Sequence, residues 1–144
     1  MDRSKYPPNW EAFSRSIRSD RAQGRCECKG ECGTDHGGRC EARNGGHRII
    51  GISVEFETLV PSDKELESFF DLFRAENYKA SKIVLTVAHL HRHGCDYKPP
   101  YCTRRRHVKA MCQQCHLRYD GDQRRANASR TRRRKKKNME LFEI

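Results

Sequence analysis

The segment from residue 111 to residue 122, MCQQCHLRYDGD, joins two cysteines to a histidine that directly follows the second of them. Cys112 and Cys115 are separated by two residues, a spacing that lets both sulfurs reach one tetrahedral zinc ion. A disulfide or a chance cluster could produce the same pattern. The choice depends on the other cysteines of the chain and on the redox compartment in which it folds.

Eight cysteines are enough for two zinc sites that each hold four thiolates. One site could use Cys26, Cys28, Cys32 and Cys40, and the other could use Cys95, Cys102, Cys112 and Cys115. A competing arrangement pairs Cys26 and Cys32 with Cys112 and Cys115 across the domain. Proximity along the chain favours two separate sites, although the spacing leaves both arrangements open. Either way the zinc is structural, because four thiolates leave no coordination position for a substrate.

Histidines gather in the same part of the chain. Of the seven, five lie between residues 89 and 116: His89, His91, His93, His107 and His116. Hydrolysis of a phosphodiester requires a base that activates water and a divalent ion that neutralises the developing charge. Imidazole suits either role near neutral pH. Each histidine alone would be interpreted as a surface or hydrogen-bonding residue, but beside the CxxC pair the group predicts a hydrolytic site.

The composition indicates a small hydrophobic core that needs additional stabilising links. The chain is 35% hydrophobic and 34% charged, and small domains of this kind are usually held together by metal or by disulfides. The polar first 21 residues do not resemble a signal peptide, and no apolar run has the length of a membrane span. We therefore expect a cytoplasmic protein without a membrane partner. In a reducing compartment thiol pairs bind metal more often than they form disulfides, which disfavours a disulfide-rich secreted module.

The positive charge of the chain is concentrated near its end. Residues 124–137 carry nine Arg or Lys residues and no acidic residue, and without these nine the net charge of +11 falls to +2. Such a segment binds phosphate backbones without reading their sequence, although solubilising or disordered tails can look the same. The candidate nucleic-acid contacts are Arg124, Arg125, Arg130, Arg132, Arg133, Arg134, Lys135, Lys136 and Lys137.

The first elements of the chain can be placed from spacing. Asn9 is a candidate N-cap for a helix that carries Trp10, Phe13 and Ile17 on one face and ends at Gly24. Residues 24–46 are rich in Gly and Cys, so we expect a metal-bound knuckle there rather than a regular element. Residues 47–56 alternate in polarity, which predicts a half-buried strand with Ile50, Ile52, Val54 and Phe56 on the buried face.

Two further strands and two helices complete the prediction. Ser62 and Glu65 form a capping-box pattern at the start of a helix whose apolar side contains Leu66, Phe69, Phe70 and Phe73. Residues 82–90 are the segment that most strongly predicts a strand, and His89 lies at the end of that strand. A short strand at 107–111 leads into the CxxC turn, a helix begins near Cys115, and Gly121 can break it before the basic tail.

These residues resemble the HNH endonuclease family, particularly its small phage and bacterial members. The similarity is strongest in VLTVAHLHRH (84–93) and RRHVKAMCQQCHLRYD (105–120), and YPPNWEAFSRSIR and RCECKGECG resemble the opening of such proteins. It covers roughly residues 5–121, with an insertion around 57–80. The resemblance implies a ββα-metal (His-Me finger) fold, in which two antiparallel strands and a helix grip a divalent ion, with zinc knuckles bracing them. It also implies cleavage of DNA that leaves a 5′-phosphate and a 3′-hydroxyl.

The resemblance also assigns roles residue by residue. His89 matches the histidine that activates water, and His116 matches the histidine that binds the catalytic metal. The middle position of the motif, usually Asn, falls on His107, which could orient the base or bind metal. Ala88 stands where many members carry an acidic metal ligand, so His91 or His93 could supply that ligand.

We therefore expect an α+β protein in three parts. These are an N-terminal helical segment at 1–24, a zinc-braced nuclease domain at 25–121 and a basic tail at 122–144. The predicted function is that of a metal-dependent DNA endonuclease, which acts in the bacterial host cytoplasm if phage-encoded. It would hold one or two structural zinc ions and a catalytic Mg²⁺, Mn²⁺ or Ni²⁺. The alternative is a zinc-braced protein that binds DNA without cutting it, because its site has decayed.

Overall fold

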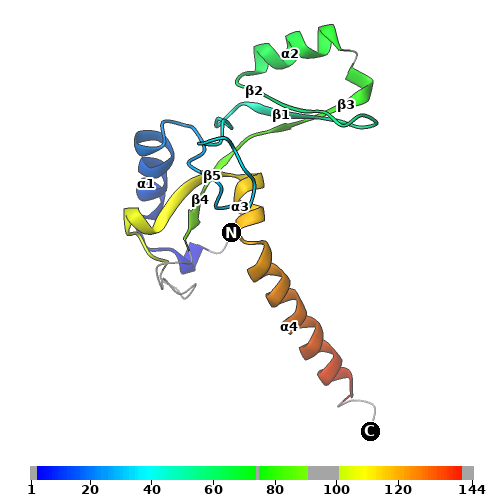
Figure 1. The fold of residues 1–144 in the computed structure, drawn as a ribbon. Coiled ribbons are helices and arrows are strands. Elements are labelled where there is room, and N and C mark those ends of the chain that lie inside the picture. The colour runs from blue at the N-terminus through cyan, green and yellow to red at the C-terminus, as the bar shows by residue number, and fades with distance from the viewer. Residues whose placement is uncertain (1–2, 74, 91–100, 141–144) are drawn as a thin grey trace.

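The computed structural model describes residues 3–73, 75–90 and 101–140, which form two lobes and a projecting helix (Figure 1). Both sheets are small and antiparallel, with strand orders β2-β1-β3 and β4-β5, so the predicted α+β class is confirmed. The elements in chain order are η1(Arg3–Lys5), α1(Trp10–Arg15), η2(Ser16–Arg21), β1(His47–Gly51), β2(Glu57–Val60), α2(Asp63–Leu72), η3(Ala75–Asn77), β3(Tyr78–Lys82), β4(Leu85–His89), η5(Arg105–His107), β5(Val108–Cys112), α3(Gln113–Tyr119) and α4(Gly121–Glu140).

The cysteine-rich lobe is built around the β4–β5 pair. Leu85 pairs with Cys112 and His89 with Val108, so the end of β4 lies beside the start of β5. Leu85, Met111 and the N-terminal Ile17 are fully buried between this pair and the first helix. Because β5 pairs with β4 and continues directly into α3, these three elements lie close together, although the segment between the two strands is long.

The first helix begins where the sequence predicts but differs in two details. Asn9 stands at its N-cap as predicted, although the Asn9 side chain makes no capping hydrogen bond. The helix widens into the π-helical turn η2, a rare geometry that is often found near functional sites. Gln23 and Gly24, with φ of 53° and 67°, then reverse the chain into the cysteine-rich loop.

The second lobe is a three-stranded sheet with α2 beside it. Glu65 N donates a 3.3 Å hydrogen bond to Ser62 Oγ, so Ser62 caps the start of α2, as the predicted pattern requires. Phe69 is the centre of an aromatic cluster on this helix, with ring centroids 4.8 to 5.9 Å from those of Phe56, Phe73, Tyr78 and Phe70. Partly exposed aromatic rings therefore join α2 to the sheet.

The predicted face of the first strand is wrong. His47 and Ile49 are buried, whereas Ile50, Ile52, Val54 and Phe56 expose 39 to 53% of their surface. The strand ends at Gly51, whose backbone N–H donates to Phe56 O at 2.9 Å and closes a turn. A side chain at Gly51 would collide with the backbone oxygen of Val54, so this turn requires glycine. The alternation beyond Gly51 therefore belongs to a turn rather than to a continuing strand.

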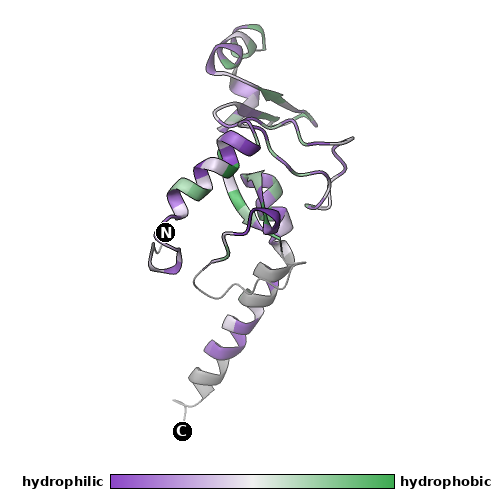
Figure 2. Ribbon diagram, turned by 90° about the vertical axis from the view of Figure 1, so that its left-hand side faces the viewer, coloured by the Kyte–Doolittle hydropathy of each residue, from purple (hydrophilic) through white to green (hydrophobic). Residues whose placement is uncertain are grey.

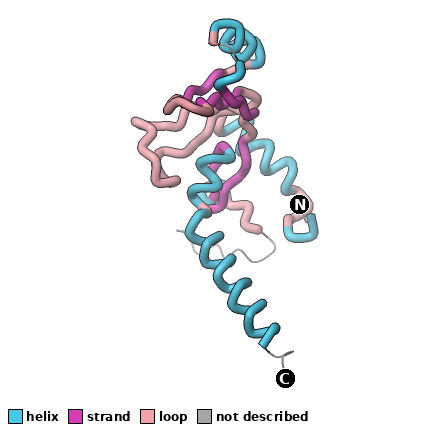
Figure 3. The backbone as a smooth tube through the Cα atoms, turned by 90° about the vertical axis from the view of Figure 1, so that its right-hand side faces the viewer, coloured by secondary structure: helices cyan, strands magenta, loops and turns pink. Residues whose placement is uncertain are grey.

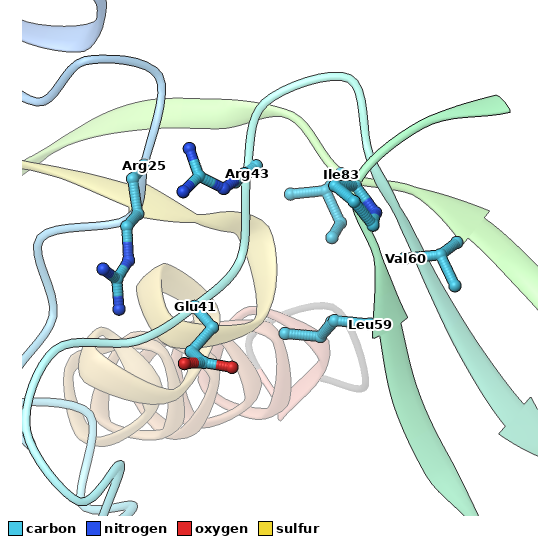
Figure 4. Close-up of a pocket in the computed structure, with 7 residues that line it drawn as sticks. Arg25, Glu41, Arg43, Leu59, Val60 and Ile83 are labelled. Carbon is cyan, nitrogen blue, oxygen red and sulfur yellow. The ribbon is translucent and has the colours of Figure 1, made fainter. Parts of the chain in front are cut away.

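The two lobes are joined at Ile83, between β3 and β4. Ile83 N donates to Gly46 O at 2.7 Å, and Gly45 N donates to Ile83 O at 2.8 Å, so the end of the cysteine-rich loop pairs with the connection. A cavity of about 230 Å³ lies beside this junction (Figure 4). Its labelled lining residues are Arg25, Glu41 and Arg43 from the loop, Leu59 and Val60 from β2, and Ile83 from the connection. The lobes thus meet across a partly open seam.

The basic segment is a helix rather than an irregular tail. Helix α4(Gly121–Glu140) leaves the body after α3 and extends away from it, as both side views show (Figures 2 and 3). Its described side chains from Ala128 to Lys135 are exposed. By 20-residue length alone it spans about 30 Å. Within the described residues, no helix combines the length and apolar character that crossing a bilayer requires.

Candidate metal centre and neighbouring histidines

Four buried thiols from distant parts of the chain converge at the base of α3. The sulfurs of Cys26, Cys40, Cys112 and Cys115 all lie within 4.8 Å of one another, and each side chain is almost completely buried. The Cys40 and Cys115 sulfurs are 3.9 Å apart, and Cys112 N donates a 3.3 Å hydrogen bond to Cys26 Sγ. Four thiolates at these separations could hold a metal such as zinc and would leave no open coordination position.

The electrostatics of the thiol group favour a cation. Hydrogen bonds with the Cys115, Cys26 and Cys40 thiols hold the pKa of Cys112 well below its ordinary value. The hydrogen bond to Cys112 is the largest cause of a raised pKa at Cys115, followed by those to Cys26 and Cys40. The group thus favours a thiolate at Cys112 that its neighbours stabilise with their protons. A divalent ion can replace those protons, and metal binding releases them to solvent.

Paired arginines give the cysteine-rich loop its shape in place of regular structure. Arg25 donates from its side chain to Cys40 O and Arg39 O at 3.1 and 2.9 Å. Arg39 donates in return to Cys26 O, Ala22 O and Arg25 O, each at 2.8 Å. The two guanidinium groups satisfy carbonyls on opposite limbs of the loop, and so hold Cys26 and Cys40 near each other.

The structure groups the cysteines differently from the preferred sequence prediction. Cys26 and Cys40 join Cys112 and Cys115, so the four-plus-four division along the chain is wrong. The competing cross-domain arrangement contains Cys26, Cys112 and Cys115 of this group, but it has Cys32 where the structure has Cys40. The reason lies in backbone pairing, because Cys26 N donates to Ala42 O at 2.9 Å and Cys40 N donates to Cys28 O at 2.8 Å. Cys95 lies outside the described residues.

A second group of ligand atoms lies beside the first. Cys28, Cys32 and His36 place their sulfur and nitrogen atoms within 4.8 Å of one another and of Cys115 Sγ. His36 Nε2 is 3.3 Å from Cys32 Sγ and 3.5 Å from Cys115 Sγ. The pKa of Cys32 falls to about 7: burial, the largest influence, opposes this, but hydrogen bonds from Thr34 and His36 outweigh it. His36 was not predicted from the sequence, although its spacing of four from Cys32 is a metal-ligand spacing.

An ion-pair network docks this loop on β5. Arg21 donates to Glu27 Oε1 at 2.9 Å and to Val108 O at 2.9 Å. Ala110 N donates to the Glu27 carboxylate at 2.7 Å, and Glu27 N donates to Ala110 O at 2.7 Å. Glu27 therefore hydrogen-bonds to the backbone of Ala110 in both directions, as a residue of a neighbouring strand would. Lys109 forms an ion pair with Glu31. Burial, the largest influence, raises the pKa of that carboxyl, but the Lys109 contact and backbone hydrogen bonds outweigh it and lower the pKa to about 2.

His89 lies at the end of β4 with a defined ring orientation. Its Nε2 is 3.0 Å from the backbone oxygen of Cys102, and a carbonyl can only accept. Nε2 therefore carries the proton, and in the neutral ring Nδ1 is the acceptor nitrogen. The indole of Trp10 stacks on the His89 imidazole, with ring centroids 5.6 Å apart and planes 14° from parallel. The ring centroid of Tyr101 also lies 5.6 Å from that of His89.

His116 is oriented by the opposite nitrogen. Thr86 Oγ1 donates to Met111 O at 3.2 Å, so the 2.7 Å contact between Thr86 Oγ1 and His116 Nδ1 uses the imidazole proton. In the neutral ring Nε2 is then the acceptor, and it lies 3.2 Å from Asp120 Oδ2. These two atoms could share a divalent ion, since a histidine that binds metal commonly donates its other nitrogen to a protein oxygen.

His107 takes a different position. It is buried, its Nε2 accepts from Arg106 Nε at 3.2 Å, and its Nδ1 lies 3.5 Å from Cys102 Sγ. His107 thus contacts the residue whose carbonyl orients His89. Among the described residues, no group of three or more ligand atoms includes His89, His107 or His116. His91 and His93 lie outside the described residues, as do any ligands they would provide.

A cavity of about 580 Å³ opens beside His116. Trp10 and Arg18 line it from the first helix, Thr86 and Val87 line it from β4, and His116 lines it from α3. The cavity therefore contacts the ring that stacks on His89 and also the imidazole of His116. Arg18 and Glu11 add charges of opposite sign to a wall that is otherwise mainly aromatic and aliphatic.

Comparisons with protein-family models, with curated proteins and with solved structures find no match for this chain. The function is therefore inferred from the geometry of the site and from the sequence pattern.

Proposed function

We propose that the protein is a metal-dependent DNA endonuclease of the HNH type in which His89 activates water. The observation that carries the proposal is the contact between His89 Nε2 and Cys102 O. It fixes the imidazole tautomer whose Nδ1 can accept a proton, and stacking by Trp10 restrains the ring. A base must be held in position in its proton-accepting form, and this arrangement provides both.

The remaining roles follow from the strand, strand, helix order of β4, β5 and α3. His116 Nε2 and Asp120 Oδ2 would bind the catalytic divalent ion. Such an ion supplies positive charge to the oxygen that leaves phosphorus. Asp120 could compensate for Ala88, which is fully buried and offers no ligand where the family pattern has an acidic one. His107 would act as a positioning residue, because it contacts Cys102 rather than the cavity.

The proposed reaction is hydrolysis of one backbone bond. His89 Nδ1 removes a proton from water as the water oxygen bonds to phosphorus. The bond from phosphorus to the 3′ oxygen breaks, and that oxygen takes a proton from solvent or from a bound water. The products are a 5′-phosphate and a 3′-hydroxyl. Arg18 in the cavity wall and the arginines of α4 provide positive charge for binding the phosphates of the substrate.

A second candidate is the non-catalytic zinc-braced DNA-binding protein. The absence of a three-atom ligand group around His116 among the described residues favours it. In that case α4 and the zinc-braced lobe would bind DNA through its phosphates, and the histidines would only support the lobe.

Cleavage of supercoiled plasmid with Mg²⁺, Mn²⁺ or Ni²⁺ separates the two functions. We expect wild type to nick the plasmid and His89→Ala to be slower by roughly 10² to 10⁴-fold with unchanged DNA affinity. His47→Gln is the matched control, because His47 lies in the other lobe beside Asp63. Cleavage by neither protein with any metal, together with tight DNA binding, would establish the non-catalytic function. Equal cleavage by wild type and His89→Ala would rule out His89 as the base.

A further inference from the structure

We propose that the protein holds two zinc ions bridged by the thiolate of Cys115. One ion would bind Cys26, Cys40, Cys112 and Cys115, and the other would bind Cys28, Cys32, His36 and Cys115. This dinuclear centre is independent of the proposed nuclease activity, because it concerns the brace of the fold rather than the histidines beside the cavity.

The number of donors supports a bridge. Two tetrahedral ions without a shared ligand require eight donors, but the two groups contain seven different side chains because both include Cys115. A thiolate has several lone pairs and can bind two ions at once. Sharing Cys115 therefore completes both coordination shells, whereas an unshared arrangement leaves one ion with three protein ligands.

The distances match two adjoining tetrahedra. With zinc–sulfur bonds of about 2.3 Å, two thiolates on one tetrahedral ion lie about 3.8 Å apart, and a sulfur and an imidazole nitrogen lie about 3.5 Å apart. Cys115 Sγ is 3.9 Å from Cys40 Sγ in the first group and 3.5 Å from His36 Nε2 in the second. Cys115 Sγ thus lies, in both groups, at the distance expected between two ligands of one zinc ion.

The surrounding contacts hold the second group against α3 independently of any ion. Arg118, three residues after Cys115, donates to Thr34 Oγ1 at 2.6 Å, midway between Cys32 and His36 in the chain. Glu31 accepts from Lys29 N at 2.7 Å and pairs with Lys109 of β5. The loop that carries Cys28, Cys32 and His36 is therefore fixed on both sides of the bridging sulfur.

The chemistry of the donors selects zinc or a similar thiophilic ion. Six of the seven donors are cysteines and one is a histidine, a set that favours zinc over the oxygen-binding Mg²⁺. Each thiol must lose its proton on binding, so assembly of the centre is favoured by rising pH and opposed by acid.

The stoichiometry is tested by native mass spectrometry of the full chain, refolded with zinc under reducing conditions. We expect two zinc ions in wild type and one in His36→Ala, which removes the least buried ligand and spares the four-cysteine group. Cys102→Ser is the matched control, since Cys102 belongs to neither group, and it should keep both ions. One zinc ion in wild type, or two in His36→Ala, would overturn the proposal.

The bridge itself is tested on the wild-type chain, which avoids any folding defect of a Cys115 variant. Replacing zinc with ¹¹³Cd should give two cadmium resonances, each split by the other because one sulfur joins the two nuclei. The split should vanish in His36→Ala, where a single resonance remains. Two unsplit resonances in wild type would show separate sites and would reject the shared thiolate.

Discussion

The imidazole of His89 donates from Nε2 to the backbone oxygen of Cys102 over 3.0 Å, which ties the end of β4 to the segment that precedes β5. Cys102 is also contacted through its sulfur by the buried His107. The segment before β5 thus contacts His89 through the Cys102 backbone and His107 through the Cys102 sulfur. The same contact makes the orientation of His89 depend on its immediate neighbours, and this dependence can be tested.

Trp10 should support the proposed base by stacking. Replacing Trp10 with Leu removes the ring that lies 14° from parallel to His89, so the imidazole gains freedom to leave its reactive orientation. We expect the rate of plasmid cleavage at saturating DNA to fall roughly 10-fold, because small misplacements of a reacting group are costly. Trp10→Phe retains an aromatic face and should recover most of the rate. A Leu variant that cleaves as fast as wild type would show that stacking does not position His89.

Metal removal should unfold the cysteine-rich lobe. Cysteine and alanine make up ten of the fifteen buried residues of the core around Cys112 and Cys115, so we expect thiolate–metal bonds to supply much of its stability. A strong chelator, or the variant Cys112→Ser, should abolish the near-ultraviolet circular dichroism of the lobe. The half-exposed Cys102 provides the control, and Cys102→Ser should retain that signal. A metal-free chain with an intact near-ultraviolet spectrum would contradict this dependence.

Arg21 should be the most important arginine for stability. Its guanidinium binds Glu27, Val108 O and Arg105 O, and three-quarters of the side chain is covered. Arg21→Met leaves the Glu27 carboxylate without its cation, so the free energy of unfolding in urea at fixed zinc should fall by about 2–4 kcal/mol. Arg15→Met is the control, because the Arg15–Glu11 pair is exposed and 3.8 Å long, and it should cost less than about 0.5 kcal/mol. Equal losses in both variants would contradict a special role for Arg21.

Local signals in the sequence predicted local structure well. Ser62 and Glu65 marked the start of α2 because a capping box involves only four consecutive residues. The apolar run before His89 predicted a strand that ends there, as it does in β4. Each of these predictions depends on neighbours in the chain, and neither needs the position of a distant segment.

Predictions that required distant contacts were less successful. The grouping of Cys26 with Cys40 depends on backbone pairing within the loop and on the paired arginines, Arg25 and Arg39, which no cysteine spacing reveals. The buried face of β1 was misassigned because the turn at Gly51 interrupts the alternation. His36 was overlooked because it stood apart from the histidines near the CxxC pair.

Helix α4 was missed for another reason. The charge of its sequence predicts a basic tail, yet Arg, Lys and Ala are good helix formers and neither Gly nor Pro occurs between Asp122 and Glu140. The signal for a helix was therefore present in the composition. The absence of apolar periodicity explains why this helix projects instead of packing against the lobe.

The projecting helix leads to the last prediction. Its described side chains from Ala128 to Lys135 are exposed, so the lobes do not need them for burial, and truncation after Gln123 should leave melting temperature and zinc content unchanged. The nine basic residues of 124–137 should instead neutralise DNA phosphates and release counterions. Each phosphate contact contributes roughly −0.9 to the slope of log affinity against log salt, so truncation should make that slope shallower by several units.

The truncated protein also separates binding from cleavage. It should bind every DNA sequence more weakly at low salt and still cleave at saturating DNA, because His89 and His116 lie outside the helix. Changing Arg132, Arg133 and Arg134 to Gln keeps the helix but removes three charges, and should flatten the salt slope by a smaller amount in the same direction. Unchanged affinity in both variants would assign the helix to a partner other than DNA. Loss of the folded state on truncation would show that α4 supports the lobe through α3, which its exposed surface argues against.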